Sequence, residues 1–151
     1  MSKLPPVGAE LISVMIGGEQ YAIDIMAVRE IRGWTRSTPV PHAPEHVLGM
    51  INLRGAVLPV IDLGARLGLG KIDPDKSSVV VVAQIGGRQV GLLVDAVCDI
   101  VMVTENMLQE TPDVGHGEIR DFVDGIMTID EAIVGLLSLE NLLPSDGRAA
   151  A

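Results

Sequence analysis

Several features are scarce or missing in this chain of 151 residues, and each of these absences excludes a class of protein. Cys98 is the only cysteine, so an internal disulfide framework is excluded and a reducing compartment is expected. The longest apolar run, VVVVA at 79–83, is far shorter than the roughly 18 residues of a membrane helix. No basic segment leads into an apolar one at the N-terminus, so no signal peptide is expected. These features predict a cytoplasmic protein without direct membrane insertion.

Aromatic residues and basic charge are scarce as well. Tyr21, Trp34 and Phe122 are the only aromatic residues, and the net charge is -9. Residues 77–151 carry 3 basic and 12 acidic side chains, whereas residues 1–76 carry 8 of each. Nucleic-acid binding needs clustered positive charge and stacking aromatics. We therefore expect no nucleic-acid partner.

The chain does contain a repeat. IGGEQYAIDIMAVREI at 16–31 returns as IGGRQVGLLVDAVCDI at 85–100, at an offset of 69 residues. GMINLRGAVLPVIDLGARL at 49–67 returns in apolar pattern as GIMTIDEAIVGLLSLENLL at 125–143, at an offset of 76. The change of offset predicts an insertion in the second copy, which we place at 111–121. The sequence thus indicates two copies of one unit of about 60 residues.

Each copy has the pattern of paired strands around short turns. Gly17-Gly18 and Gly86-Gly87 separate β-type segments, as do Arg54-Gly55 and the turn near Asp130-Glu131. Strands are expected at 11–16, 21–25, 28–34, 50–53, 57–61, 79–85, 90–94, 97–103, 126–129 and 133–137, and helical turns at 44–48, 63–67 and 139–143.

Five short strands in about 60 residues predict a small barrel, because closure removes exposed sheet edges. A unit of this size buries too little surface alone, so the two should pack together. We therefore expect an all-β protein of two five-stranded β-barrels with short helices. The expected first barrel lies at about 10–70 and the second at about 77–144, between flexible tails at 1–9 and 145–151. The sequence leaves open whether a strand swaps between the barrels.

Three segments resemble the CheW family of bacterial chemotaxis coupling proteins. They are YAIDIMAVREIRG, HVLGMINLRGAVLPVIDL and RQVGLLVDAVCDI, within a resemblance that covers about 10–143. The resemblance implies a CheW-like domain of two five-stranded SH3-like β-barrels at 10–144. It also implies an adaptor that is not an enzyme. Such an adaptor links the cytoplasmic tips of methyl-accepting chemotaxis receptors to the regulatory domain of the histidine kinase CheA. Its expected location is the receptor arrays at the inner membrane.

The resemblance also implies a binding site. The receptor-facing residues would line a groove between the barrels: Val28, Glu30, Ile31, Arg54, Val97 and Ile100. The kinase would meet exposed apolar residues at the outer end of the first barrel, and a neighbouring kinase domain would meet the second; no residues are assigned to these faces. The acidic second copy departs from the family pattern at Asp113, Glu118, Asp121, Asp124 and the turn Asp130-Glu131-Ala132, which weakens the expectation for the second contact.

Plainer interpretations exist for the same residues. Arg54 fits a solvated loop arginine, and Val28, Val97 and Ile100 fit core packing. Glu30 and Arg54 are either unrelated charges or a pair across the groove worth about 0–1 kcal/mol.

No metal or cofactor is expected. His42 and His46 are four residues apart, but Pro44 lies between them and no third ligand is near, whereas zinc sites want three or four. His116 fits a loop, and Cys98 is expected to be a buried, inert thiol. GLGKID, from Gly68, lacks the G-K-[ST] of a phosphate loop and is interpreted as a polar linker between the copies.

Two other functions remain open from sequence. One is a CheW-like adaptor of another chemosensory pathway, such as pilus motility or development. The other is a small ligand- or metal-binding protein that uses the groove.

Overall fold

The computed structural model describes residues 4–34, 38–39, 41, 47–74, 78–110, 122–129 and 131–142. The strands are β1 (Glu10–Ile16), β2 (Glu19–Asp24), β3 (Val28–Gly33), β4 (Val47–Leu53), β5 (Ala56–Asp62), β6 (Val79–Ile85), β7 (Arg88–Val94), β8 (Ala96–Met102), β9 (Leu108–Glu110), β10 (Val123–Ile129) and β11 (Ala132–Leu137). The helices are each three or four residues long: η1 (Ile25–Ala27), α1 (Leu63–Arg66) and α3 (Leu139–Leu142). The predicted all-β class is confirmed. None of the helices in these described segments is long and apolar enough to cross a membrane.

Two details of the predicted elements differ. Val47 and Leu48, expected in a helical turn, begin β4, while the rest of that turn lies outside the described residues. Neither η1 nor β9 was expected, because segments of three residues carry too little periodicity to be recognised in sequence. The insertion placed at 111–121 lies outside the described residues.

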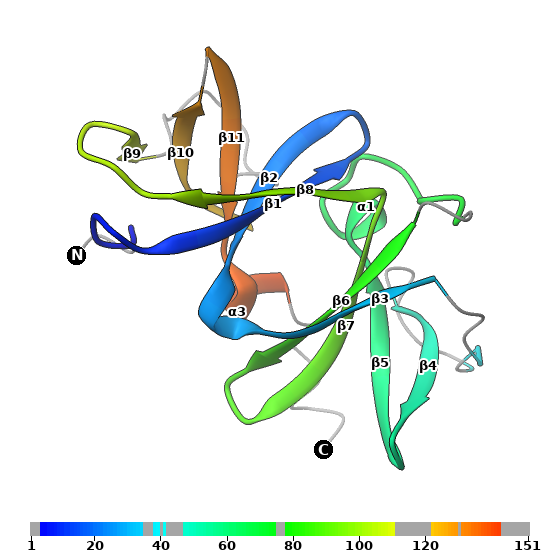
Figure 1. Ribbon diagram of the computed structural model, residues 1–151. Helices are drawn as coiled ribbons and strands as arrows, with labels where there is room; N and C mark the ends of the chain where they lie inside the picture. The colour runs from blue at the N-terminus through cyan, green and yellow to red at the C-terminus, as the bar shows by residue number, and fades with distance from the viewer. Residues whose placement is uncertain are drawn as a thin grey trace.

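The strands form two sheets with the same internal order (Figure 1). The six-stranded sheet runs β8-β1-β2-β11-β10-β9, and the five-stranded sheet runs β3-β6-β7-β5-β4. When each strand is replaced by its counterpart in the other copy, the first five strands of one order become the other order. The duplication in sequence is therefore a duplication of strand order in space.

Each sheet draws strands from both copies. The hairpin β1–β2 belongs to the first copy, yet β1 pairs with β8 and β2 runs parallel to β11. In the same way, β6 pairs with β3 and β7 runs parallel to β5. The hairpins are thus exchanged between the copies. The sheets differ from the expected division into barrels at about 10–70 and 77–144, because the hairpin that opens each copy lies in the other copy's sheet.

The sheets curl without becoming closed five-stranded barrels. Among the described residues, no strand ladder joins β8 to β9 or β3 to β4. In the five-stranded sheet, the chain after β3 returns to the free edge of β4 through an isolated bridge between Thr38 and Met50. The counterpart in the other sheet is β9, which pairs with β10.

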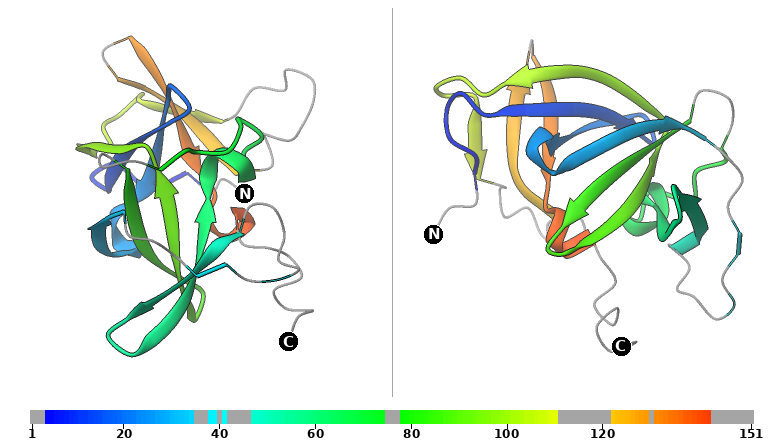
Figure 2. Two further views of the ribbon diagram at one scale, coloured as in Figure 1. Left: turned by 90° about the vertical axis from the view of Figure 1, so that its right-hand side faces the viewer. Right: turned by 60° about the horizontal axis from the view of Figure 1, so that its bottom comes forward.

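Figure 2 shows the two sheets from two further directions. The core lies between and inside them: Ile12, Val14 and Ile23 of the hairpin β1–β2 join a large apolar cluster with residues of β5, β6 and β7. Leu11 and Ala22, from the same two strands, belong to a smaller cluster inside the six-stranded sheet. The two strands therefore bury both faces, since alternate residues point to opposite sides. Packing the copies together supplies the apolar layer that a single unit lacks.

The linker between the copies is docked rather than loose. Ile72 is buried, and its backbone N–H donates to Oδ2 of buried Asp62 at 2.9 Å. The other oxygen of Asp62 accepts from the Ala65 N–H at 3.0 Å and caps α1. The interpretation of GLGKID as a merely polar linker is thus corrected, because its apolar residues pack on α1.

One arginine joins the two helices. Arg66 of α1 donates from Nε to the Leu142 carbonyl at 2.9 Å and from an Nη to the Asn141 carbonyl at 3.1 Å. Its guanidinium lies 4.7 Å from the ring centroid of Phe122. Charge-assisted bonds of this kind to helix-end carbonyls connect the end of one copy to the end of the other.

Candidate functional site

The outer strands β3 and β8 are counterparts in the repeat, and both carry a bulge at the same place. The register of β3 against β6 shifts between Val28 and Glu30, and that of β8 against β1 shifts between Val97 and Ile100. A bulge re-aims the side chains next to it. The repeat therefore places two similarly bent edge strands on one side of the molecule (Figure 1).

The six predicted groove residues divide between these strands and one turn. Val28 and Val97 are half-buried against the shared core, which agrees in part with the plainer core interpretation. Ile31 and Ile100, at matched positions of the repeat, are 46% and 62% exposed. Exposed β-branched side chains at matched edges are not explained by packing within this chain.

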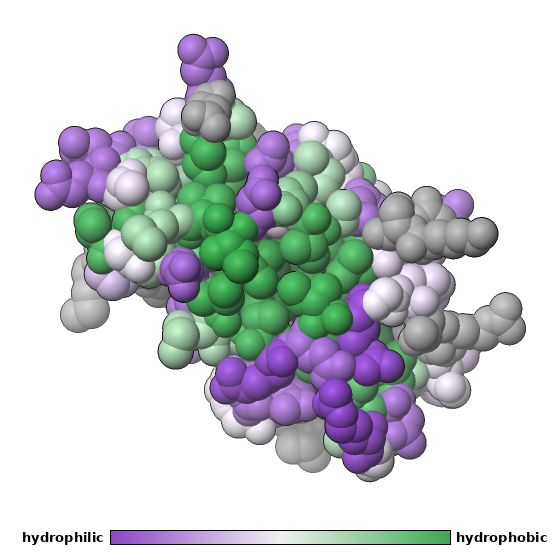
Figure 3. Space-filling view, in the orientation of Figure 1, coloured by the Kyte–Doolittle hydropathy of each residue, from purple (hydrophilic) through white to green (hydrophobic). Residues whose placement is uncertain are grey.

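Figure 3 shows an apolar area between β8 and β3, bordered by hydrophilic residues on the side of the five-stranded sheet. Met102, which the sequence interpretation did not include, adds to the exposed apolar residues of β8 at 55% exposure. Its position two residues after Ile100 on one strand was the available signal, because alternate residues share a face.

Arg54 lies in the turn between β4 and β5 and pairs with Glu30 of β3. Its Nη1 is 2.8 Å from Oε1 of Glu30 and its Nη2 is 3.3 Å from Oε2, a two-pronged contact. Because β3 and β4 are the two edge strands of the same sheet, the pair links the edges of one sheet rather than crossing between sheets. The Arg54 side chain remains 74% exposed.

A second arginine completes this charged cluster. Arg32, two residues along β3, donates from Nη1 to Oε2 of Glu30 at 2.8 Å. The hydrogen bond from Arg32, followed by that from Arg54, lowers the pKa of Glu30 from its ordinary value. Glu30 is thus held as a carboxylate that fixes the Arg54 side chain. Arg32 was missed in sequence, although the spacing of two on a strand places it on the same face as Glu30.

The matched bulge in β8 is built differently. The Ser13 hydroxyl of β1 accepts the Asp99 N–H at 3.0 Å and donates to the Asp99 carbonyl at 3.2 Å. In the second copy, the counterpart of Ser13 is Val82, which has no hydroxyl. Val82 lies opposite Glu30 in the ladder between β6 and β3. A buried hydroxyl therefore supplies backbone hydrogen bonds that the bulge removes from the ladder.

Two other predictions about reactive groups have different outcomes. Cys98 is exposed, which corrects the expectation of a buried thiol; it sits in the bulge, where strict alternation from Val97 does not hold. His42, His46 and His116 lie outside the described residues. Within the described ranges, no group of three His, Cys, Asp or Glu side chains is placed to hold a metal ion.

Comparison with known proteins decides the family. The profile of the CheW-like domain matches residues 10–147 of this chain. The chain belongs to the CheW family. It is 49% identical over 144 residues to the chemotaxis protein CheW of Rhizobium meliloti (strain 1021), a match that covers 95% of this chain and 93% of that protein. It is 33% identical to the chemotaxis protein CheW of Klebsiella aerogenes, over 95% of this chain and 86% of that protein.

A solved CheW structure has the same fold. The crystal structure of the scaffolding protein TtCheW from Thermoanaerobacter tengcongensis aligns with a TM-score of 0.82 at 34% identity, covering 89% of this chain and 92% of that chain. The CheW family is one of chemotaxis adaptors and scaffolds, not a catalytic family.

Proposed function

We propose that this CheW-family chain couples methyl-accepting chemotaxis receptors to the histidine kinase CheA, without catalysing a reaction itself. The observation that carries the proposal is the pairing of exposed Ile31 and Ile100 on matched edge strands, beside an arginine held in place by Glu30. An apolar area with a fixed cation at its border suits an amphipathic helix, which would place apolar side chains on the area and a polar group on Arg54.

The receptor-facing set in this proposal is Val28, Glu30, Ile31, Arg54, Val97 and Ile100. Glu30 acts as a positioning residue, since its two-pronged contact orients the Arg54 guanidinium. Arginine can offer its remaining donors to carboxylates or helix-end carbonyls of a receptor tip. Val28 and Val97 support the strands from below, because both pack on the core.

The kinase is proposed to meet a different surface. Val57 lies on the β4–β5 hairpin and is 60% exposed, which makes it an apolar candidate on the five-stranded sheet. Ile133, its counterpart on β11, is 69% exposed and is the candidate for a neighbouring kinase domain. With separate surfaces, the chain would work at the cytoplasmic tips of receptors in arrays at the inner membrane. Coupling between the two partners would then be reciprocal.

The test is charge reversal of Arg54. Arg54→Glu should change the free energy of unfolding by no more than about 0.5 kcal/mol, because the side chain is largely exposed. It should weaken binding to a receptor cytoplasmic fragment at least about tenfold, or roughly 1.4 kcal/mol, by placing two carboxylates together at the contact. Calorimetry gives the receptor affinity, and a reconstituted ternary complex gives kinase activation.

The matched control is Glu131→Arg, a charge reversal in the counterpart turn of the six-stranded sheet. That variant should bind receptor normally, and both variants should bind the isolated CheA regulatory domain normally. A folded Arg54→Glu protein that binds receptor and activates the kinase like the parent would show that Arg54 has no such role. Loss of the fold would instead make Arg54 a structural residue.

A further inference from the structure

The edge strands β3 and β8 are counterparts in the repeat, but their burial patterns differ. Along Val28–Gly33 of β3, half-buried and exposed residues alternate, as expected for a strand on a core. Along β8, three consecutive residues are exposed: Cys98, Asp99 and Ile100. Three exposed neighbours do not arise in a regular strand, because successive side chains point to opposite faces. Asp99 is the residue that differs, since its counterpart Glu30 is half-buried.

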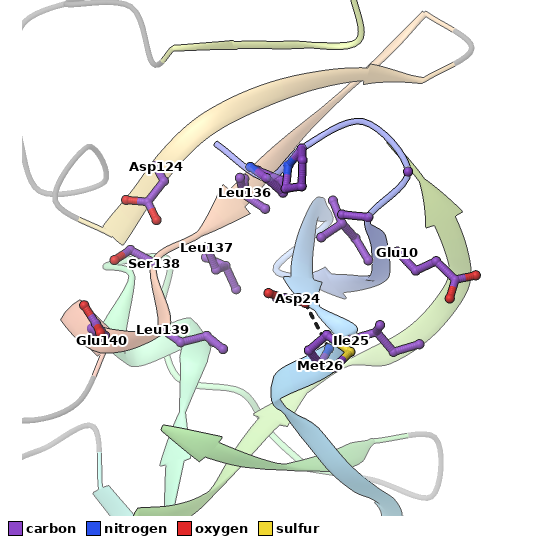
Figure 4. Close-up of a pocket in the computed structure, with 15 residues that line it drawn as sticks. Glu10, Asp24, Ile25, Met26, Asp124, Leu136, Leu137, Ser138, Leu139 and Glu140 are labelled. Carbon is purple, nitrogen blue, oxygen red and sulfur yellow. Dashed lines mark hydrogen bonds between the residues drawn. The ribbon is translucent and has the colours of Figure 1, made fainter. Parts of the chain in front are cut away.

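Both edge strands begin at a corner that an aspartate holds. Before β3, the Asp24 carboxylate accepts the Met26 N–H at 2.9 Å (Figure 4). Before β8, the Asp95 carboxylate accepts the Gly17 N–H at 2.8 Å, and the Asp95 N–H donates to the Met15 carbonyl at 2.9 Å. Because each corner is anchored, the difference between the two strands is expected to arise further along, at the bulges.

The residue opposite the bulge differs between the copies. Val82 of β6 lies directly opposite Glu30 in the ladder. Ser13 of β1 has no direct partner in β8, and its hydroxyl fills that place. The hydroxyl accepts the Asp99 N–H at 3.0 Å and donates to the Asp99 carbonyl at 3.2 Å, so one residue uses both its acceptor and its donor. Ser13 is 3% exposed. A buried side-chain oxygen between two backbones holds them farther apart than a direct ladder bond does.

The two matched carboxylates also differ in their charge partners. Glu30 accepts hydrogen bonds from two arginines, whose counterparts in the second copy are Val101 and Asp130. Asp99 forms no ion pair with any residue in the described part of the chain. One edge strand thus carries a carboxylate that is already neutralised. The other carries an exposed carboxylate beside Ile100, able to accept a cation from outside the chain.

We infer that Ser13 is a positioning residue of the receptor-facing surface: its buried hydroxyl holds the β8 bulge open and turns Asp99 outward, to accept a Lys or Arg of the docked helix. The inference rests on the proposed receptor function, because it assigns a charge to the β8 side of that surface. Exposed Ile31 and Ile100 would contact the apolar face of the helix. Arg54 would meet an acidic or carbonyl group, and Asp99 a basic one.

This arrangement gives the surface a polarity. The fixed cation belongs to the five-stranded sheet, whereas the outward carboxylate belongs to the six-stranded sheet. A helix with an acidic and a basic group on either side of its apolar face would therefore gain two attractions in one orientation and meet two repulsions in the reverse one. Charges at the border of an apolar contact act chiefly in this way, on orientation and choice of partner.

The charge is tested by calorimetry of the full chain with a receptor cytoplasmic fragment. Asp99→Lys should weaken binding at least tenfold, because it places a cation against a cation. Asp99→Asn should weaken binding about threefold, the size expected for one exposed ion pair. Raised salt should reduce the difference between the parent and Asp99→Lys. The matched control Glu105→Lys reverses another exposed carboxylate, in the turn after β8, and should bind like the parent.

The positioning role is tested by a double-mutant cycle. Ser13→Val introduces the residue that β6 has at the matching place, whereas Ser13→Thr keeps the hydroxyl. Ser13→Val should close the ladder, seen as stronger nuclear Overhauser contacts between the backbones of residues 13 and 99, and should weaken receptor binding about threefold; Ser13→Thr should do neither. In the Asp99→Asn background, Ser13→Val should have almost no further effect, because the carboxylate that it positions is gone. Ser13→Ala removes the hydroxyl without adding volume and replaces Ser13→Val in the cycle if that variant does not fold.

A folded Asp99→Lys protein that binds receptor like the parent would overturn the inference. The proposed function would still stand in that case if Arg54→Glu, measured alongside, loses affinity. Equal losses from removing the hydroxyl with and without the Asp99 carboxylate would make Ser13 a structural residue only, and an unchanged bulge after its removal would show that the hydroxyl does not hold the bulge open. If the parent does not bind the receptor fragment, the proposed function fails and the inference fails with it.

Discussion

The two halves of this molecule share a strand order and differ at matched surface positions. The β4–β5 turn has Arg54 and Gly55, with φ of 55° and 87°, whereas its counterpart between β10 and β11 has Glu131 at φ 70° in place of the glycine. Helix α1 has the buried Gly64 under the linker, and α3 has the exposed Glu140 at the matching position. The bulge in β3 carries a charged cluster, and the bulge in β8 is held by Ser13.

The comparison shows that the two halves keep the same backbone pairing while their surface residues differ. Apolar core positions in both halves need only fill space at similar volume, so they can drift without changing the fold. Some matched surface positions differ in chemistry, such as Gly55 and Glu131 in the turns, whereas others, such as Ile31 and Ile100, keep an exposed apolar side chain. One plan of strands therefore yields two chemically different faces, which is what an adaptor with separate partners requires.

The largest effect should come from the covered helix. Gly64→Ala should lower the free energy of unfolding by about 2–3 kcal/mol, because the new methyl group displaces the Gly70 backbone and with it the packing of Ile72. The matched change on α3, Glu140→Ala, should stay within about 0.5 kcal/mol, because the Glu140 side chain is exposed. Urea unfolding of both variants measures the difference, and equal losses would mean that the covering segment is not what distinguishes the helices.

The second largest loss of stability is expected from removing Arg66, whose side chain connects α1 to α3. Arg66→Ala removes two charge-assisted hydrogen bonds and the stacking on Phe122, which should cost about 2 kcal/mol. Arg66→Lys keeps the charge but loses the forked geometry, so it should recover less than half of that loss. Thermal unfolding followed by circular dichroism ranks the stability of the parent, Arg66→Lys and Arg66→Ala proteins. An unchanged Tm for Arg66→Ala would show that the halves do not need this connection.

A smaller effect is expected from exchanging the turn residues. Glu131 holds a backbone conformation that costs an L-residue about 1 kcal/mol, so Glu131→Gly should raise stability by about 0.5–1 kcal/mol. Gly55→Glu imposes that cost on the other half and should lower stability by about 1 kcal/mol. Chemical denaturation of the two single variants measures whether their free energies of unfolding change in opposite directions. Two changes of the same sign would contradict the argument from the backbone angle φ.

The smallest effect concerns proton binding at Glu30. Its pKa is lowered in the folded chain, so the contribution of the ion pairs is complete at neutral pH and is lost as the pH falls through that lowered value. Arg32→Val makes β3 resemble β8, which has Val101 at the matching place, and should raise the Glu30 pKa by removing the main cause of the shift. Carbon-detected NMR titration of the carboxyl group gives the midpoint in each protein. A midpoint that does not move would assign the shift to Arg54 alone.

The strands were predictable because their pattern is local. The alternation and the paired glycines place β1, β2, β6 and β7 within a residue or two of where they lie. The exchange of the hairpins was not predictable, because moving a hairpin from one sheet to its counterpart leaves every local pattern unchanged. Periodicity records which face of a strand is buried and not which strand lies beside it.

The site was predictable in part for a similar reason. The chain's own sequence could suggest the exposed positions of Ile31 and Ile100 only through the resemblance, since β-branched residues on a strand fit the core equally well. The exposure of Cys98 depends on a bulge, which breaks the alternation that was used to place it.

The exchanged hairpins also set the order in which the chain can fold as it is made. β2 is complete at Asp24, yet its parallel partner β11 begins only at Ala132. At about 5–20 residues per second, the first hairpin emerges roughly 5–20 s before that partner does. The five-stranded sheet, whose last strand β7 ends at Val94, can assemble while the first hairpin still waits. Biosynthesis therefore produces an intermediate with one finished sheet and an apolar hairpin in need of protection.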